Sequence, residues 1–246
     1  MVEKSNRHST RRSTELQKPR VTDKFLYRAA VKEDEAVILE CVLTGFLQTN
    51  SLAMAMKLTR NDTFEYLKWV VERSLHTPYS VIVHERSSGK LAGIRLYSVT
   101  HRDGTEDFQP FQLDCNSMSE NGKLWYNIVH KLDQSIWSLQ PDAQKILHHE
   151  ITFTDPHFQR QGIANHFLNL LNIKQLTAEG IAGLQSEATS YQSQKMQRKL
   201  GYIELMESDQ SELVYSDGSP IIFPDETKTL KLFFLPLNRM MPKSSL

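Results

Sequence analysis

The residues with the clearest chemical meaning lie between a strand-like run, residues 146–154, and an apolar helix-like run. The sequence Gln159-x-x-Gly162-x-Ala164 joins the two runs. Small residues at 162 and 164 let an anionic group approach the backbone. The free amides and the dipole of the first helical turn favour negative charge. The motif therefore predicts a pyrophosphate-binding loop, although a turn that only caps the helix would explain so short a pattern about as well.

Two titratable residues, His148 and Glu150, stand two positions apart in the strand-like run before this loop. Strict alternation along a strand places both side chains on one face. The residues expected on that face are His148, Glu150, Thr152 and Thr154, and those expected on the other face are His149, Ile151 and Phe153. In an apolar cleft such a glutamate has a raised pKa and exchanges protons with a histidine through water. A pair that faces solvent from an edge strand is the equal alternative.

The hydrophobic periodicity of the whole chain predicts alternating strands and helices. Helices are expected over residues 32–46, 64–75, 123–139, 163–176 and 191–200. Strands are expected over residues 25–31, 79–85, 91–99, 146–154, 183–189, 202–206, 214–223 and 229–235, with a turn at 215–219. Strands and helices mixed at this spacing indicate an α/β or α+β sheet with helices on both faces.

Three segments resemble the GNAT N-acetyltransferase superfamily. Asp155-Pro156 followed by Gln159-x-x-Gly162-x-Ala164 is similar to the superfamily's acetyl-CoA loop. The run from Thr189 to Tyr202, which ends in Leu-Gly-Tyr, is similar to the helix beside the pantetheine arm of the cofactor. Residues 215–223 and 229–235 are similar to the C-terminal hairpin of invertebrate arylalkylamine N-acetyltransferases. The order of elements matches this superfamily over residues 25–237.

The resemblance implies a mixed α/β GNAT fold. Its central, mostly antiparallel, twisted sheet would be splayed between the fourth and fifth strands, with helices on both faces. Acetyl-CoA would lie in that opening as co-substrate, and backbone groups near Phe153 and Thr154 would hold its pantetheine arm. The residues expected around its pyrophosphate are Gln159, Arg160, Gln161, Gly162, Ile163 and Ala164.

The resemblance also suggests which side chains take part in catalysis. The superfamily often places its base at positions that match His148 and Glu150. Two catalytic groups that relatives usually carry are missing from this sequence. Residues 46–51, after the first helix, hold no carboxylate base, and Gln197 stands where many relatives have a tyrosine acid. Ser193 matches a hydroxyl position of the invertebrate helix and is the candidate acid, with a plain helix-surface serine as the alternative.

Composition excludes several classes of protein. The chain has 246 residues, of which 39% are hydrophobic, and its 29 basic and 29 acidic side chains give no net charge, which argues against a protein that coats nucleic acid. No apolar run approaches the roughly 20 residues of a membrane-spanning helix. Two cysteines, Cys41 and Cys115, cannot build a disulfide scaffold or a Cys-rich zinc module. We therefore expect a soluble cytoplasmic protein with no metal and no nucleic-acid or membrane partner.

One domain between two tails is expected. Residues 1–24 hold seven Lys or Arg and three Asp or Glu with almost no apolar side chains, which predicts a disordered basic tail. Residues 25–237 are expected to form the acyltransferase domain, with an acidic loop and a helix inserted at 101–140, and residues 238–246 a second tail.

The resulting prediction is an N-acetyltransferase that moves acetyl from acetyl-CoA directly to a small primary amine, with arylalkylamines favoured. The acidic loop at 101–122 would attract a cationic amine if it folds over the mouth of the cleft. The alternatives are a non-catalytic acyl-CoA-binding or protein-interaction module and a peptide or protein acetyltransferase. The sequence leaves open the identity of the amine, the length of the acyl chain and the oligomeric state.

Overall fold

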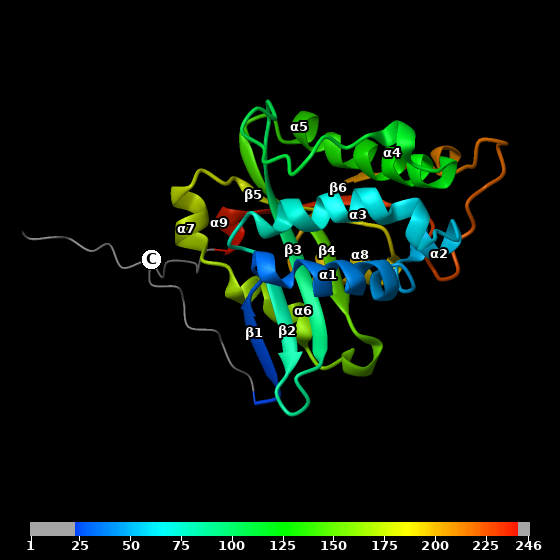
Figure 1. Ribbon diagram of the computed structural model, residues 1–246. Helices are drawn as coiled ribbons and strands as arrows, with labels where there is room; N and C mark the ends of the chain where they lie inside the picture. The colour runs from blue at the N-terminus through cyan, green and yellow to red at the C-terminus, as the bar shows by residue number, and fades with distance from the viewer. Residues whose placement is uncertain (1–22, 241–246) are drawn as a thin grey trace, which may run out of the picture.

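The computed structural model describes residues 23–240, and a seven-stranded sheet runs through them (Figure 1). The strands lie in the order β1-β2-β3-β4-β5-β7-β6. All neighbouring strands are antiparallel except β4 and β5, which are parallel. The strand bounds are β1 Phe25–Ala29, β2 Val81–Glu85, β3 Leu91–His101, β4 Lys145–Thr154, β5 Gly183–Ala188, β6 Ile203–Glu207 and β7 Lys231–Pro236. The expected mixed, mostly antiparallel sheet is confirmed.

The sheet opens between β4 and β5. The two strands pair only where Leu147–His149 faces Leu184–Ser186, although β4 continues to Thr154. Beyond His149 the strands separate, so the edge of β4 that faces away from β3 presents unpaired backbone groups. Such groups need a partner, and a ligand can provide it. The expected splay between the fourth and fifth strands is confirmed.

Helices cover both faces of the sheet (Figure 1). One hydrophobic core lies between the sheet and the helices from α1 to α5, and two smaller cores lie on the other face under α6, α7 and α9. The bounds are α1 Glu35–Cys41, α2 Ser51–Ala55, α3 Arg60–Leu75, α4 Glu120–Gln134, α5 Ile136–Leu139, α6 Ile163–His166, α7 Ile173–Ala178, α8 Tyr191–Lys199 and α9 Leu237–Met240. Side chains such as Ile38 and Leu67 are fully buried, and the burial of each contributes about 1.5–3 kcal/mol to the free energy of folding.

Residues 214–223 do not form the predicted strand. Only a single bridge joins Val214 to Pro220, and Ile222 is 71% exposed. Proline cannot donate to a β-ladder, and Pro220 and Pro224 both fall in or beside this segment. The C-terminal pairing is instead made by β7, which lies between β5 and β6.

The predicted helix over residues 163–176 is broken. α6 ends at His166, a 3-10 turn spans Phe167–Leu170, and α7 begins at Ile173. Asn172 caps α7 by accepting a hydrogen bond from the amide of Gln175, and this local bond favours a new helix over a continuous one.

Two smaller differences lie near the N-terminal end. α3 begins four residues earlier than expected, at Arg60, because Thr59 and Asp62 form a capping box. α2 was not predicted. It is capped by Asn50, whose side-chain oxygen accepts from the amide of Ala53.

The insertion at residues 101–140 does not fold over the cavity as a charged lid. His101 donates its amide to Asp107, and Arg102 donates to four carbonyl groups between 137 and 143, so the loop is held against its own domain. None of residues 101–122 lines the cavity that opens between β4 and β5. The condition under which this acidic loop would attract the amine, that it folds over the mouth of the cavity, is therefore not met, although α4 of the same insertion does line the cavity.

Most of the two predicted tails lies outside the described residues, which leave out 1–22 and 241–246. Within 23–240, Lys24 lies against the domain, where its ammonium group donates to Gln161 at 2.8 Å and approaches Glu85 at 3.5 Å. Residues 238–240 belong to α9. No helix in this described range has both the length and the apolar character needed to cross a bilayer.

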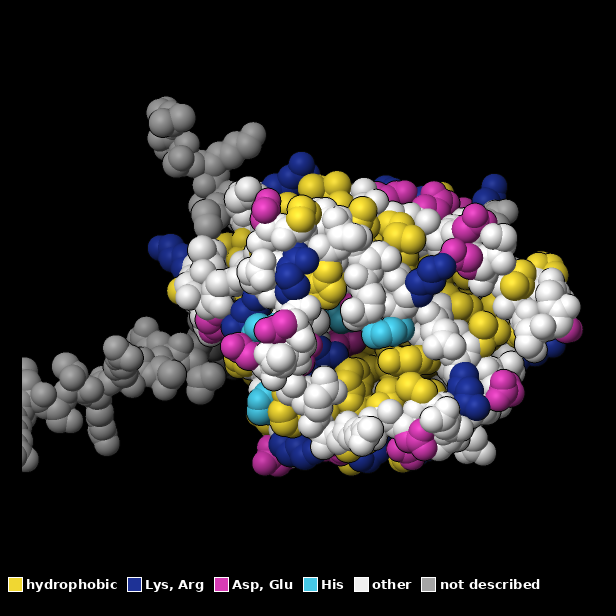
Figure 2. All heavy atoms as spheres, turned by 90° about the horizontal axis from the view of Figure 1, so that it is seen from above, with side chains coloured by type: hydrophobic (Ala, Val, Ile, Leu, Met, Phe, Trp, Pro, Cys, Tyr) yellow, Lys and Arg dark blue, Asp and Glu magenta, His cyan; other side chains and the backbone are white. Residues whose placement is uncertain are grey.

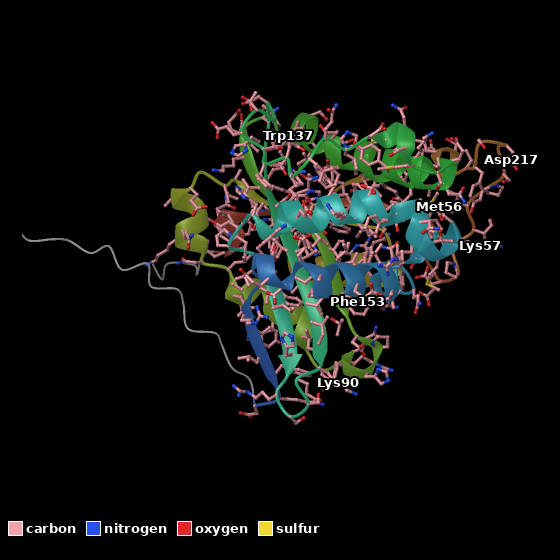
Figure 3. The ribbon with its side chains drawn as sticks, viewed as in Figure 1. Met56, Lys57, Lys90, Trp137, Phe153 and Asp217 are labelled. Carbon is pink, nitrogen blue, oxygen red and sulfur yellow. The ribbon has the colours of Figure 1, made fainter. Side chains whose placement is uncertain are left out.

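Side-chain positions follow the same division between interior and surface. Figure 3 shows Phe153 inside the molecule and Lys57, Lys90 and Asp217 at its margin. On the face seen in Figure 2, basic and acidic side chains are scattered among one another and neither sign gathers in a patch.

Candidate active site

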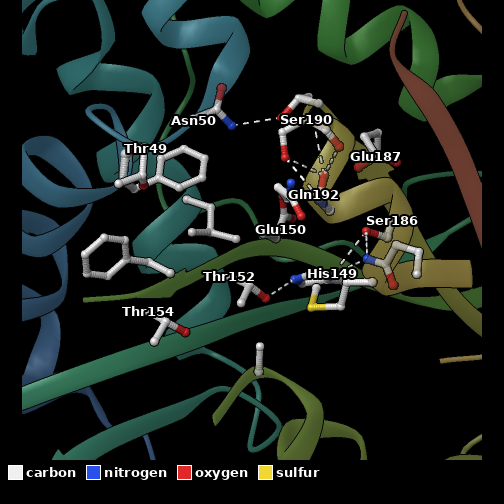
Figure 4. A pocket seen from close by; sticks show the side chains of 18 of the residues that line it. Thr49, Asn50, His149, Glu150, Thr152, Thr154, Ser186, Glu187, Ser190 and Gln192 are labelled. Atoms are coloured by element: carbon white, nitrogen blue, oxygen red, sulfur yellow. Dashed lines mark hydrogen bonds between the residues drawn. The ribbon is translucent and has the colours of Figure 1, made fainter. Parts of the chain in front are cut away.

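A cavity of about 860 Å³ lies where β4 and β5 separate, and the loop of residues 159–164 closes one end of it. Its other walls come from the segment before α2, from α3 and α4, and from the start of α8. Figure 4 shows side chains from these distant segments pointing into one space. The predicted loop, the predicted strand residue Glu150 and the predicted acid Ser193 all line it.

The predicted pyrophosphate loop has the backbone that an anion site needs. Arg160 and Gly162 both have positive φ, at 58° and 86°. Alternation of left- and right-handed residues turns successive N–H groups toward one side, where they form an anion-binding concavity. A Cβ placed on Gly162 would meet nothing within 4 Å, so the space above the loop is open.

Five of the six predicted loop residues line the cavity, and Gln161 does not. The side chain of Gln161 accepts from Lys24 and donates to the carbonyl of His157 at 3.3 Å, so it stabilises the outer side of the loop. Asp155 supports the turn before it by accepting from the amide of His157 at 2.8 Å. These hydrogen bonds stabilise the loop from the side that faces away from the cavity.

A β-bulge changes the predicted faces of β4. Leu96 lies opposite Ile151, while Tyr97 lies opposite His149, which leaves Glu150 as the extra residue. Strict alternation therefore fails after His149. Ile146, His148, Glu150, Ile151 and Phe153 lie toward α3 and α4, whereas Leu147, His149, Thr152 and Thr154 lie toward the opposite face. The expectation that Thr152 and Thr154 share a face with His148 is wrong.

His148 lies among three carboxylates. Its Nε2 is 2.6 Å from Glu187, and its Nδ1 is 3.4 Å from Glu150 and 3.8 Å from Asp133. Burial alone lowers the pKa of His148, but the three negative charges outweigh burial and hold the pKa well above its usual value. His148 is therefore an imidazolium that binds the carboxylates together.

His148 itself does not line the cavity, whereas Glu150 and Glu187 do. The predicted pair, His148 and Glu150, is thus brought together, but only the carboxylate of Glu150 faces the cavity, and His148 lies behind it. In this position His148 holds the carboxylates in place. A proton path from the cavity has to begin at a carboxylate or at water beside it.

The carboxyl group of Glu150 has a lowered pKa, which corrects the predicted raised one. Burial raises the pKa, but the positive charge and hydrogen bond of His148, the charge of Arg73 and the hydrogen bond from Ser98 lower it to about 2. Ser98 donates to Glu150 at 2.5 Å. Glu150 is therefore ionised at neutral pH and offers a fixed negative charge.

This ionisation predicts a specific loss of stability in acid. A folded pKa of about 2 against a usual value of 4.5 means that Glu150 stabilises the fold above pH 4.5 and loses this contribution as the pH falls. Between pH 6 and pH 3 the wild type should lose about 2 kcal/mol more of its free energy of unfolding than Glu150→Gln. Urea unfolding at both pH values measures the difference. Equal acid sensitivity of the two proteins would contradict the lowered pKa.

Ser193 takes part in the capping box of α8. Its hydroxyl donates to the carbonyl of Ser190 at 2.8 Å, and its amide donates to the hydroxyl of Ser190 at 3.1 Å. The hydroxyl proton of Ser193 is thus already engaged. The structure gives Ser193 a structural role beside the cavity, and its role as an acid stays a prediction.

Neither the carboxylate of Glu187 nor the apolar wall of the cavity was predicted from the sequence. The wall is formed by Phe46, Tyr66, Leu67, Val70, Trp125 and Val129. The rings of Tyr66 and Trp125 meet edge to face at 5.2 Å. A signal for Glu187 existed, because Gln185, Ser186 and Glu187 are polar residues in a strand expected at the centre of the sheet. No signal for the wall existed, since its members come from three separate segments.

One set of side chains has metal-ligand spacing. Asp133, His148 and Glu187 each place one ligand atom within 4.8 Å of the others. Both ring nitrogens of His148 already face carboxylates, so the imidazolium supplies positive charge where a metal would supply it. This arrangement fits a charged histidine, and the expectation of no metal stays a prediction.

Comparisons with known proteins identify the fold. No family model and no curated protein sequence matches this chain. Among solved structures, arylalkylamine N-acetyltransferase 2 from Aedes aegypti is similar with a TM-score of 0.70 and 17% identity, over 87% of this chain and 99% of that chain. A putative arylalkylamine N-acetyltransferase 7 from the same mosquito has a TM-score of 0.67 and 16% identity, over 87% of each chain.

A polyamine N-acetyltransferase from Drosophila melanogaster is similar as well, with a TM-score of 0.64 and 10% identity over 86% of this chain and 99% of that chain. The chain therefore has the GNAT fold, and insect arylalkylamine N-acetyltransferases are among the structures that share it. The resemblance drawn from the sequence is confirmed at the level of the fold.

Proposed function

We propose that this protein is an acetyl-CoA-dependent N-acetyltransferase that acetylates a small primary amine with an apolar body. One observation carries the proposal: a single cavity has an anion-binding loop at one end and two carboxylates beside an apolar wall at the other. The first end suits a pyrophosphate and the second suits an ammonium group on an apolar body. The shared fold with GNAT acetyltransferases supports acetyl transfer in general.

Acetyl-CoA fits this cavity in one direction. The amides of residues 160–164 would hold the pyrophosphate, and the free edge of β4 near Phe153 and Thr154 would bond the pantetheine arm. The thioester would then lie where β4 and β5 separate, beside Glu150. The loop binds through backbone groups, so the affinity for acetyl-CoA depends little on its side chains.

The amine would enter along the apolar wall, with its ammonium group between Glu150 and Glu187. Because the pKa of Glu150 is about 2, this carboxylate attracts and orients the ammonium group as a fixed negative charge, and water takes up the proton that the nitrogen loses. The lone pair of the neutral nitrogen attacks the carbonyl carbon of the thioester. The C–N bond forms, the C–S bond breaks, sulfur leaves with the electron pair, and the nitrogen loses its second proton to water to give the neutral amide.

Arylalkylamines are the favoured acceptors because the wall is rich in aromatic side chains. Phe46, Tyr66 and Trp125 offer faces and edges against which an aromatic ring packs with a gain of about 0.5–1.5 kcal/mol beyond its buried area. A polyamine would leave this wall without an apolar partner. The small-amine acceptor and the cytoplasmic location remain predictions.

A second candidate function is a non-catalytic acyl-CoA-binding module. The observation that favours it is the loss of two groups that the resemblance associates with catalysis. Gln197, which stands in place of the tyrosine acid, is buried and donates a hydrogen bond to Ser186. Asn50, in the segment after the first helix where relatives carry a carboxylate base, donates to Thr189 at 2.8 Å. Under this alternative the cavity binds acetyl-CoA and no amine reacts.

One experiment separates the two functions. The purified protein is first heated with and without acetyl-CoA, because a ligand that binds only the folded state raises Tm. Release of free thiol from acetyl-CoA is then followed with an arylalkylamine, an aliphatic diamine, a basic peptide and no amine. The proposal expects a rise in Tm and the fastest release with the arylalkylamine. A rise in Tm with no release on any amine would favour the non-catalytic module, and no rise would contradict both.

A further inference from the structure

A fully buried arginine, Arg95 of β3, lies directly behind the cavity wall. Its exposed fraction is 0%, and Nε and Nη1 have no hydrogen-bond partner among the described residues. No carboxylate of residues 23–240 forms an ion pair with it. Its side chain lies instead near the rings of Tyr97 and Phe167, at 5.2 and 5.8 Å. A buried charge without a counter-charge is costly, so this site favours an anion nearby.

Arg95 contacts the cavity through His149. Nη2 of Arg95 lies 3.4 Å from Nδ1 of His149, and the hydroxyl of Ser186 lies 3.0 Å from the same nitrogen. A guanidinium group donates and never accepts, and the hydroxyl of Ser186 already accepts from Gln197 at 2.8 Å. Nδ1 is therefore an acceptor, and the proton of the neutral imidazole is on Nε2.

The hydrogen bonds of this group all run in one direction. Nε2 of His149 faces the hydroxyl of Thr152, so His149 donates to Thr152. Thr152 has no acceptor for its own hydroxyl proton among the side chains and backbone groups of the described chain, and it lines the cavity. Figure 4 shows Ser186, His149 and Thr152 in this sequence. The chain of hydrogen bonds therefore starts at the buried donors Arg95 and Gln197, passes through His149 and ends at the hydroxyl of Thr152 on the cavity wall. Hydrogen bonds aligned in this way polarise and strengthen one another.

His149 remains neutral in this setting. Burial lowers its pKa, and the charges of Arg95 and His148 lower it further, well below the usual value. The other groups around it are Tyr97, 5.7 Å away between ring centres, and Tyr202, whose hydroxyl approaches Arg95 at 3.4 Å. None of these neighbours is a carboxylate, so the positive charge of Arg95 is not offset at His149.

We propose that Thr152 is a catalytic residue whose hydroxyl donates a hydrogen bond to the CoA sulfur as it leaves, and that His149 and Arg95 position and polarise that hydroxyl. The inference rests on the proposed function, because it requires the thioester to lie where β4 and β5 separate. The C–S bond breaks with its electron pair on sulfur, and the sulfur leaves as a thiolate that takes up a proton from solvent after release. The site then needs no tyrosine acid, which accounts for Gln197.

The test is the acidity of the CoA thiol when bound. Free CoA is added to the purified full-length protein, and the ultraviolet absorbance of the thiolate is recorded against pH. A nearby positive charge and a donor favour the thiolate, so we expect the pKa of the bound thiol to lie about 1–3 units below that of free CoA. Thr152→Val removes only the hydroxyl and should reverse at least about half of this shift.

Kinetics add a second readout. With a reactive amine, Thr152→Val should lower kcat by about 10²-fold, the effect of removing one donor to a developing charge, while the affinity for acetyl-CoA stays within about threefold. Arg95→Met should also lower kcat. Thr177→Val, on α7 and away from the cavity, is the matched control and should keep the full shift in thiol pKa.

The outcomes distinguish the inference from the function on which it rests. A bound thiol with the pKa of free CoA in the wild type, or a full shift retained by Thr152→Val, overturns the role of Thr152 and leaves the acetyltransferase proposal intact. If CoA and acetyl-CoA do not bind at all, both proposals fail.

Discussion

Glu150→Gln should lower kcat/KM for a reactive arylalkylamine by about 10²-fold, the size of effect expected when one partner of a buried pair of opposite charges is lost. The substitution keeps the size of the side chain and removes a negative charge that the structure holds in place through His148, Ser98 and Arg73. The ammonium group of the acceptor then loses one of its two carboxylates. Steady-state release of thiol measures the effect.

The affinity for acetyl-CoA should hardly change in this variant, because backbone groups of residues 160–164 are expected to bind the cofactor. Thermal shift with acetyl-CoA provides that check. Glu226→Gln is the control, since Glu226 is an exposed carboxylate that does not line the cavity. Wild-type kcat/KM in Glu150→Gln would remove Glu150 from the mechanism.

Gly162→Asp should weaken acetyl-CoA binding by at least about 100-fold. Gly162 is the residue before α6, with φ of 86° and open space where a Cβ would project. An aspartate there sets a negative charge against the pyrophosphate, and such like-charge contacts cost several kcal/mol. Isothermal titration with acetyl-CoA measures the loss in affinity, and the Tm rise caused by acetyl-CoA should disappear with it.

Gly162→Asn separates charge from shape. Asparagine and aspartate have nearly the same size, and both tolerate the left-handed backbone better than other side chains. The asparagine variant should bind acetyl-CoA within about tenfold of wild type. If both variants bind equally well, or lose binding equally, the loss is not electrostatic and the pyrophosphate assignment at Gly162 fails.

The two expected results depend on different kinds of information. The phosphate loop could be predicted because it is local: glycine at 162, alanine at 164 and the neighbouring strand and helix lie within about twenty residues of one another. The backbone of this loop has positive φ at Gly162 and also at Arg160, and neither angle was predicted from the sequence. Short-range patterns of this kind depend on the chain's own stereochemistry.

The carboxylate site could be predicted only in part. His148 and Glu150 stood out because titratable residues are unusual in an apolar strand, and the structure does bring them together. The direction of the Glu150 pKa could not be predicted, because it depends on Arg73 and Ser98 as well as on His148. Burial and charge act in opposite directions here, and only the distances decide which effect is larger.

The sequence by itself determined the sheet-and-helix class, the loop that suits a pyrophosphate and the strand that carries Glu150. The tertiary structure decided which side chains share a face and which meet. The bulge at Glu150 moved Thr152 to the side of His149, and pairing between β4 and β5 brought Glu187 to His148. Both depend on register between strands that are far apart in the chain, and a one-residue change of register reverses every face. Local periodicity contains no record of that register, so the roles of Thr152, His149 and Glu187 emerged only from the folded chain.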